Sequence, residues 1–169
     1  MAAPLGRLLR HLCFPPWRLR RVLPRPSLEA ITHAIRASEQ RHGGEIHCAV
    51  EAALDWRRLL RGVSPRERAL EVFSALRVWD TEANNGVLIY LLLADRDVEI
   101  VADRGIHRRV PQEEWERICR TMEAAFREGR FEAGLLAGIE AVSEHLIRHF
   151  GGQDIQGNEL PDQPTIVRP

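Results

Sequence analysis

Residues 86–102 read GVLIYLLLADRDVEIVA, and most of the predicted architecture follows from them. Gly86–Ala94 is almost entirely apolar, which is typical of a strand buried on both faces of a sheet. Asp95-Arg96-Asp97 supplies the polar residues of a turn, and Val98–Ala102 returns as a second strand. Because so short a connection cannot be a crossover, the two strands form an antiparallel hairpin.

The hairpin also predicts which loops are neighbours. If Asp95 and Arg96 form the turn, Ala94 pairs with Asp97 and Leu88 lies opposite Asp103. The loop before the first strand then lies beside the residues that follow the second. A shift of one or two residues would not separate the two loops.

Upstream, Glu45–Glu51 alternates apolar and polar residues, which predicts a half-buried strand. Ser64-Pro65-Arg66-Glu67 is a capping box that opens a helix to about Arg77, with Leu70, Phe73 and Leu76 facing inward. A strand, a helix and a strand in this order predict a right-handed parallel crossover.

Three further helices follow from apolar residues at helical spacing. They begin after an N-cap at Ser27, at Pro111 and near Phe131, and glycines end each of them. The fold class is therefore α/β, with a mixed sheet (a parallel crossover plus a hairpin) and helices on both faces. We expect a basic leader over 1–26, a domain over 27–150 and a polar, proline-containing tail over 151–169.

The net charge of zero hides an asymmetry. Residues 1–28 hold six arginines and no acidic residue, and the rest of the chain holds 18 arginines against 24 carboxylates. An acidic folded part argues against a nucleic-acid partner. Three cysteines without a Cys-x-x-Cys pair predict neither a disulfide framework nor a zinc site, and Cys48 is expected to be a buried thiol.

The basic leader has three interpretations. Its leucines recur at helical spacing, but arginines interrupt them, so neither a signal peptide nor a transmembrane helix is predicted. It could be a strap packed on the domain, an organellar transit peptide, or an anchor on an anionic membrane surface. The arginines of such an anchor would be Arg7, Arg10, Arg18, Arg20 and Arg21.

Oxygen-bearing side chains gather in the two neighbouring loops. They are Asp80, Glu82, Asn84, Asn85 and Asp103. Calcium takes six to eight oxygen ligands, so this set is a candidate metal site with calcium as the possible cofactor. His145 and His149 stand four apart on a helix, but we expect His149 to pack near its apolar face.

Several of these segments resemble a TPM domain. They are Asn84–Ile89, Asp95-Arg96-Asp97, Asp103–Ile106 and Phe126–Ile139, and the resemblance covers roughly Ser27 to Phe150. It implies an α/β/α sandwich and a link to envelope or thylakoid quality control. Plant lumenal members are reported as acid phosphatases, some bacterial members bind calcium, and a worm member is a receptor accessory protein.

The resemblance carries two functional expectations. One is a non-catalytic or weakly catalytic interaction domain in bacterial envelope protein quality control, with a membrane or envelope protein as partner. The other is a cation-dependent, phosphatase-like hydrolase with Asp103 as the catalytic carboxylate. Val22–Pro26 lacks the carboxylate that the family often has there, which favours the first. The chain is similar to a short bacterial branch, so we expect it in the cytoplasm or peripherally at the inner membrane.

Overall fold

A computed structural model describes residues 5–151 and 158–168 of the 169-residue chain. Its sheet has the strand order β3-β2-β1-β4. The strands are β1 (Glu45–Glu51), β2 (Gly86–Leu92), β3 (Asp97–Ala102) and β4 (Thr165–Val167). β1 runs parallel to β2 and β4, and β2 runs antiparallel to β3, so the sheet is mixed as predicted.

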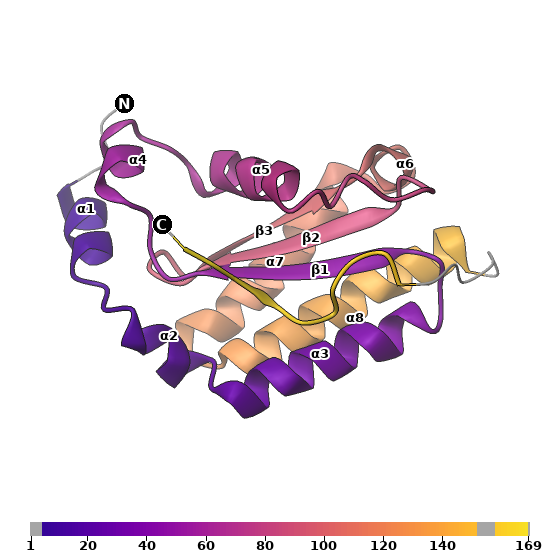
Figure 1. Ribbon diagram of the computed structural model, residues 1–169, viewed down its shortest axis with the longest axis horizontal. Coiled ribbons are helices and arrows are strands. Elements are labelled where there is room, and N and C mark those ends of the chain that lie inside the picture. The colour runs from indigo at the N-terminus through magenta and orange to yellow at the C-terminus, as the bar shows by residue number, and fades with distance from the viewer. Residues whose placement is uncertain (1–4, 152–157, 169) are drawn as a thin grey trace.

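Helices cover both faces of this sheet (Figure 1). One layer holds α2 (Trp17–Val22), α3 (Arg25–Glu39), α7 (Gln112–Arg127) and α8 (Phe131–Phe150). The other holds α5 (Pro65–Ala75), with α4 (Trp56–Leu60) and α1 (Leu5–Leu12) at one end of the sheet. The short α6 (Arg104–His107) follows β3. The predicted α/β/α sandwich is confirmed.

The hairpin register differs by two residues from the prediction. Leu92 pairs with Asp97 and Val87 with Ala102, so Leu93–Arg96 forms a four-residue connection. The reason lies in β1, because the amide of Leu93 donates to the carbonyl of Glu51 at 2.9 Å. Leu93 and Ala94 thus stay attached to the neighbouring parallel strand and are not available to lengthen the hairpin.

β1 is buried on both faces, although its alternation predicted a half-exposed strand. All seven of its residues are buried. Ile46, Cys48 and Val50 face the α3–α8 layer, and Ala49 faces the other layer. Its polar side chains Glu45, His47 and Glu51 are buried too, and each has a hydrogen-bond partner. The alternation was therefore read correctly as a strand but not as a solvent-facing one.

Glu51 explains which face α5 presents to the sheet. Arg68 donates two hydrogen bonds to its carboxylate, at 2.9 and 3.1 Å, and the Tyr90 hydroxyl donates a third at 2.6 Å. Arg68 is therefore buried, and Leu70, which we expected inside, is exposed. The capping box at Ser64 is confirmed, and Phe73 and Leu76 pack against the core as predicted, so only Leu70 was assigned to the wrong side.

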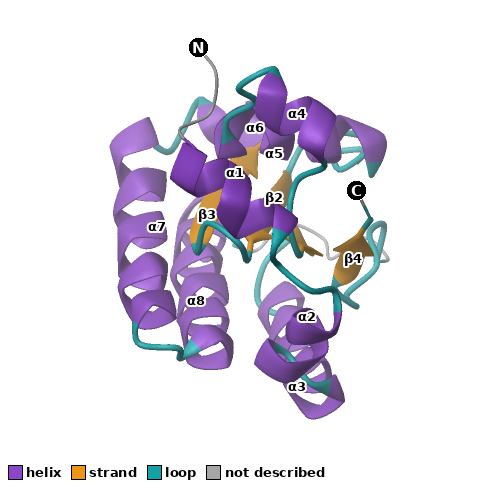
Figure 2. Cartoon of the chain, turned by 90° about the vertical axis from the view of Figure 1, so that its left-hand side faces the viewer, coloured by secondary structure: helices purple, strands orange, loops and turns teal. Residues whose placement is uncertain are grey.

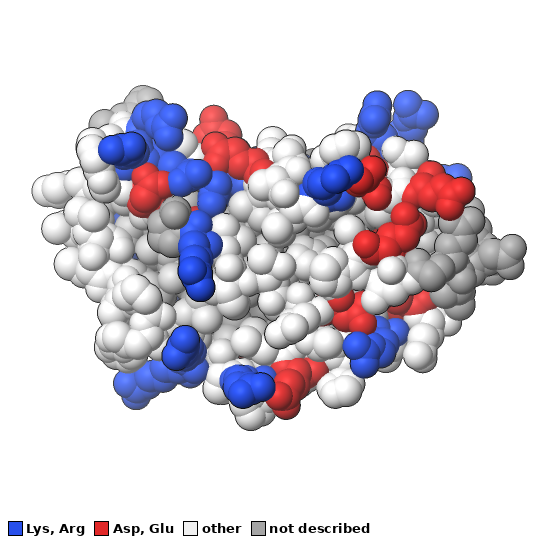
Figure 3. All heavy atoms as spheres, in the orientation of Figure 1, with Lys and Arg blue, Asp and Glu red and all other residues white. Residues whose placement is uncertain are grey.

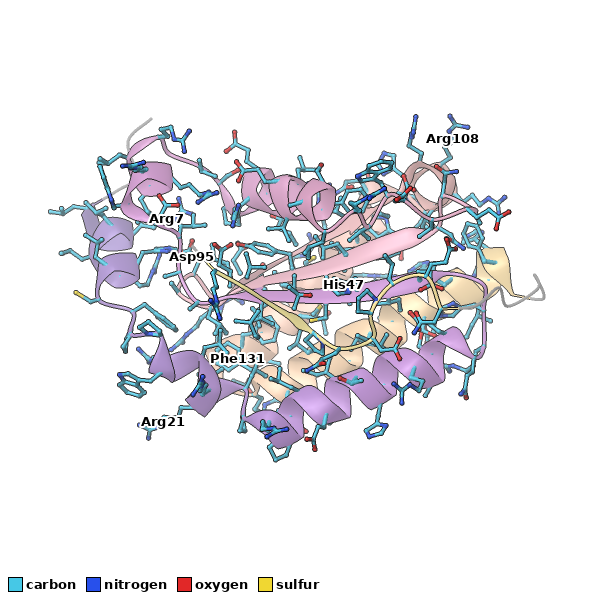
Figure 4. The ribbon with its side chains drawn as sticks, in the orientation of Figure 1. Arg7, Arg21, His47, Asp95, Arg108 and Phe131 are labelled. Carbon is cyan, nitrogen blue, oxygen red and sulfur yellow. The ribbon has the colours of Figure 1, made fainter. Side chains whose placement is uncertain are left out.

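Two other sequence expectations need correction. Ser27 is not an N-cap, because α3 begins at Arg25 and the Ser27 hydroxyl donates to Glu132 on α8. The segment expected to be a tail, 151–169, contains β4. The imidazole nitrogens of His47 lie 2.9 Å from the Pro161 carbonyl and from the Thr165 hydroxyl, which fixes this segment to β1 (Figure 4).

The buried ion pair yields a stability prediction. Replacing Arg68 by Met leaves the Glu51 carboxylate buried without its counter-charge, so the free energy of unfolding should fall by about 3–5 kcal/mol. Urea denaturation measures this. Glu71→Gln is the control, because Glu71 pairs with the same arginine at 2.8 Å but is half exposed, so it should cost less than about 1 kcal/mol. Equal effects of the two variants would contradict the assignment.

Candidate functional site

The two loops that the sequence placed together lie side by side at the end of the sheet where β1 and β2 begin. The amide of Asp103 donates to the Gly86 carbonyl at 2.9 Å, and that of Gly105 donates to the Asn84 carbonyl at 3.1 Å. A Cβ atom on Gly105 would lie 2.5 Å from the same Asn84 oxygen. Only glycine permits so close an approach of the two backbones.

Two of the five predicted ligands are buried beside this junction. Asn85 and Asp103 are 3% and 5% exposed. The Asn85 amide group donates to the Gly43 carbonyl, and Asp103 Oδ1 accepts from the amide of Arg104 at 2.6 Å. Asn85 Oδ1 and Asp103 Oδ2 are buried and have no hydrogen-bond partner. Buried oxygens of this kind call for an ordered water or a cation.

The other three predicted ligands lie at the surface. Asp80 pairs with Arg77 at 2.5 Å, three residues earlier. Glu82 and Asn84 are exposed, and Asn84 has a left-handed backbone with φ of 51°. Within residues 5–151 and 158–168, no group of three or more His, Cys, Asp or Glu side chains is arranged to hold a metal ion.

A cluster of three carboxylates that the sequence did not single out lies next to Asn85. It comprises Glu39, Glu45 and Asp162, beside a hollow that His42 also lines. Burial, together with the charges of Glu45 and Asp162, raises the pKa of Glu39 to about 8, although its Oε1 accepts from the amide of Ile46 at 3.0 Å. Glu39 ends a helix and Asp162 lies in the presumed tail, so periodicity gave no signal for either.

The basic leader is attached to the opposite end of the sheet, at the hairpin connection. Arg7 Nε and His11 Nε2 lie 2.9 and 3.0 Å from the carboxylate of Asp95, and Arg10 lies 2.8 Å from it (Figure 4). Burial opposes ionisation of Asp95, but His11 and Arg7 outweigh it and lower its pKa to about 2. Arg7 is thus paired mainly with Asp95. The Leu54 amide donates a hydrogen bond to His11 Nδ1 at 3.0 Å.

The outer side of the leader exposes apolar side chains. Leu5, Leu9, Leu12 and Trp17 are 54–71% exposed, whereas Leu19 and Leu23 are buried in the core. Arg18, Arg20 and Arg21 are exposed, and Arg21 points away from the body of the protein (Figure 4). We call the exposed side chains of α1 and α2 the leader face. Figure 2 shows both helices on the side of the protein turned to the viewer.

The histidines and the cysteine that the sequence analysis considered, His145, His149 and Cys48, lie in packing or hydrogen-bonding contacts. His145 packs on Trp115, with ring centroids 5.4 Å apart, and its Nε2 lies 3.7 Å from Glu114. The backbone carbonyl of His149 accepts from Arg109 at 2.7 Å. Cys48 is fully buried, as expected, and burial raises the pKa of its thiol to about 12.

The fold defines a class of α/β/α domain with a mixed four-stranded sheet, and the comparisons place it in a family. The sequence profile of the TPM domain matches residues 19–145. The chain belongs to the TPM domain family, as the sequence motifs indicated. Among curated proteins, none matches.

Two solved structures are similar to it. The BA42 protein of the psychrophilic bacterium Bizionia argentinensis is 30% identical, with a TM-score of 0.75, over 86% of this chain and 95% of that one. The N-terminal domain of a P. gingivalis protein is 24% identical, with a TM-score of 0.60, over 76% and 79% of the two chains. The second likeness concerns the fold alone.

No helix within residues 5–151 and 158–168 is both long and apolar enough to cross a bilayer.

The pKa of Glu39 yields a pH prediction. Its carboxyl titrates near 4.5 when unfolded and near 8 when folded, so folding favours the protonated form. This contribution is complete below pH 4.5 and is lost as the pH rises to 8. Glu39→Gln should therefore reduce the fall in unfolding free energy between pH 5 and 8. Urea denaturation across this range measures it, with exposed Glu29→Gln on the same helix as control. Parallel pH profiles for wild type and Glu39→Gln would be inconsistent with the assignment.

Proposed function

We propose that this TPM domain is an interaction domain that docks on an anionic membrane surface through the leader face and binds an envelope protein in quality control. The observation that supports it is the exposure of Leu5, Leu9, Leu12 and Trp17 beside free arginines. Apolar side chains with flanking Arg and an interfacial Trp are the features of a helix that lies in the membrane interface. Docking would be peripheral.

The contacts of the leader refine this proposal. Arg7 is engaged in an ion pair with Asp95, so the arginines that meet the lipid headgroups would be Arg18, Arg20 and Arg21. Figure 3 shows basic side chains on the side of the protein where α1, α2 and α4 lie, around an uncharged area. Anionic headgroups attract such a border, and the exposed leucines would enter the acyl boundary.

Vesicle co-sedimentation tests the docking. Arg20→Glu with Arg21→Glu should weaken partitioning onto phosphatidylglycerol-containing vesicles about 30-fold or more, since each basic residue near the surface contributes about 1 kcal/mol. Leu9→Ser with Leu12→Ser should weaken it too. The matched controls are Arg104→Glu with Arg108→Glu, at the start of α6 and just after it, at the other end of the protein, and exposed Leu70→Ser. Losses in the controls as large as in the test variants would refute the leader face.

A second candidate function is a cation-dependent, phosphatase-like hydrolase. The unpartnered oxygen Asp103 Oδ2 supports it, with Asn85 Oδ1 also unpartnered nearby, because a calcium ion would satisfy a buried carboxylate oxygen and could orient a phosphate ester. Asp80 and Glu82 would have to turn inward to supply more ligands. The fit is therefore partial, and the interaction domain is the better supported proposal.

Calorimetric titration of calcium, with magnesium as a control, tests this second candidate. Asp103→Asn keeps a cap on α6 and removes one charged oxygen, so it should abolish micromolar calcium binding and any phosphate-ester turnover. Glu29→Gln, which removes an exposed carboxylate on α3 outside the two loops, is the control and should leave binding nearly unchanged. Turnover that is unaffected by Asp103→Asn would exclude Asp103 as the catalytic carboxylate.

A further inference from the structure

An apolar groove lies between the leader and the edge of the sheet. It has a volume of about 1050 Å³ and runs between α2, the start of α3 and the segments that follow β1 and end β4. Binding pockets for small molecules commonly measure about 300–1,000 Å³, so this groove has room for a long ligand.

The groove lies where open α/β sheets usually bind ligands. In the sheet order β3-β2-β1-β4, the strands that follow β1 in the sequence, β2 and β3, lie on one side of it and β4 lies on the other. The strand order therefore reverses between β1 and β4. Ala52 and Ala53, just after β1, line the groove, and so do Val167 and Arg168 at the end of β4. Ligands in such sheets bind outside the carboxyl ends of the strands at the point of reversal.

The walls of the groove differ in burial. Leu19 and Leu23 are buried, whereas Trp17 and Ile166 are 61% and 41% exposed. An exposed tryptophan and an exposed isoleucine that line one groove leave apolar surface in contact with water. An alkyl chain laid between them would bury that surface.

Charge decides what kind of molecule suits the groove. Arg20, Arg25 and Arg168 line it, and none of its described lining residues is acidic. Among the described residues, these three arginines have no carboxylate within ion-pair distance, unlike Arg7. Guanidinium groups bind phosphate through charge-assisted hydrogen bonds.

We propose that the groove holds one acyl chain of an anionic phospholipid, with its phosphate on Arg20, Arg25 and Arg168. This inference rests on the proposed membrane docking, because α2 supplies residues to both the leader face and the groove. Docking would bring the groove to the lipid. The bound chain would then draw one lipid partly out of its leaflet.

Dodecyl phosphate below its micelle concentration is the probe, titrated calorimetrically into the full chain without vesicles. The wild-type protein should bind dodecyl phosphate. It should bind dodecyltrimethylammonium at least tenfold more weakly, and its binding of inorganic phosphate should not be measurable. Arg25→Gln with Arg168→Gln should weaken binding at least tenfold. Ile166→Glu should abolish it, whereas Leu70→Glu, equally exposed on α5, should not.

The two proposals fail separately. Absence of dodecyl phosphate binding, equal binding of the cationic amphiphile, or unchanged binding in Ile166→Glu would overturn the groove proposal, even if vesicle docking holds.

Arg25→Gln with Arg168→Gln retains the leader arginines Arg18, Arg20 and Arg21, so its docking on vesicles should persist. If dodecyl phosphate binds as predicted but wild type does not dock on vesicles, the leader face is wrong and the groove stands. Binding of dodecyl phosphate that the arginine variant does not weaken would overturn the headgroup assignment.

Discussion

The Glu51 carboxylate lies fully buried at the end of β1, and the arrangement of the sheet and of one helix layer depends on how it is neutralised. A carboxylate out of water is tolerated only when a cation and further donors reach it. Arg68 supplies the charge from α5, and Tyr90 supplies a hydrogen bond from β2. These contacts fix the rotation of α5 about its axis. The helix itself packs over β2 and β3, and the Arg68 side chain reaches β1.

The same constraint continues along β1. His47 and Glu45 are buried on the side of the strand that carries Glu51, and both find partners in residues 160–165. The sheet therefore needs β4, short as it is, because this segment satisfies polar groups that the helices do not reach. Stability here depends on matched buried polar groups as much as on apolar area.

The pattern of the sequence predicted the fold class and most elements, and the errors have physical causes. Periodicity identifies a strand, but it cannot show that a polar side chain such as Glu51 is buried with a partner. Arginine is rarely buried, so Arg68 was not assigned to the inward face of α5. Leu70 was assigned there together with Phe73 and Leu76, and only the last two pack against the core. β4 is Thr165–Val167, three β-branched residues in a polar, proline-containing stretch, which is too short a run to predict a strand. At the site, the hairpin correctly brought Asn85 beside Asp103. It could not show that Asp80 turns outward to Arg77, because that pairing depends on side-chain conformation.

The pairing of His47 with Thr165 spans 118 residues of sequence, and this has a consequence for synthesis. A ribosome makes β1 early, and the groups that complete its polar face emerge only after α8. Until then the nascent chain carries a central strand with unmatched imidazole and carboxylate groups on one side. Contacts between distant residues form slowly because loop closure comes first. Folding intermediates of this protein should therefore hold β1 against α3 with the other side of the strand still open to chaperones or to a second chain.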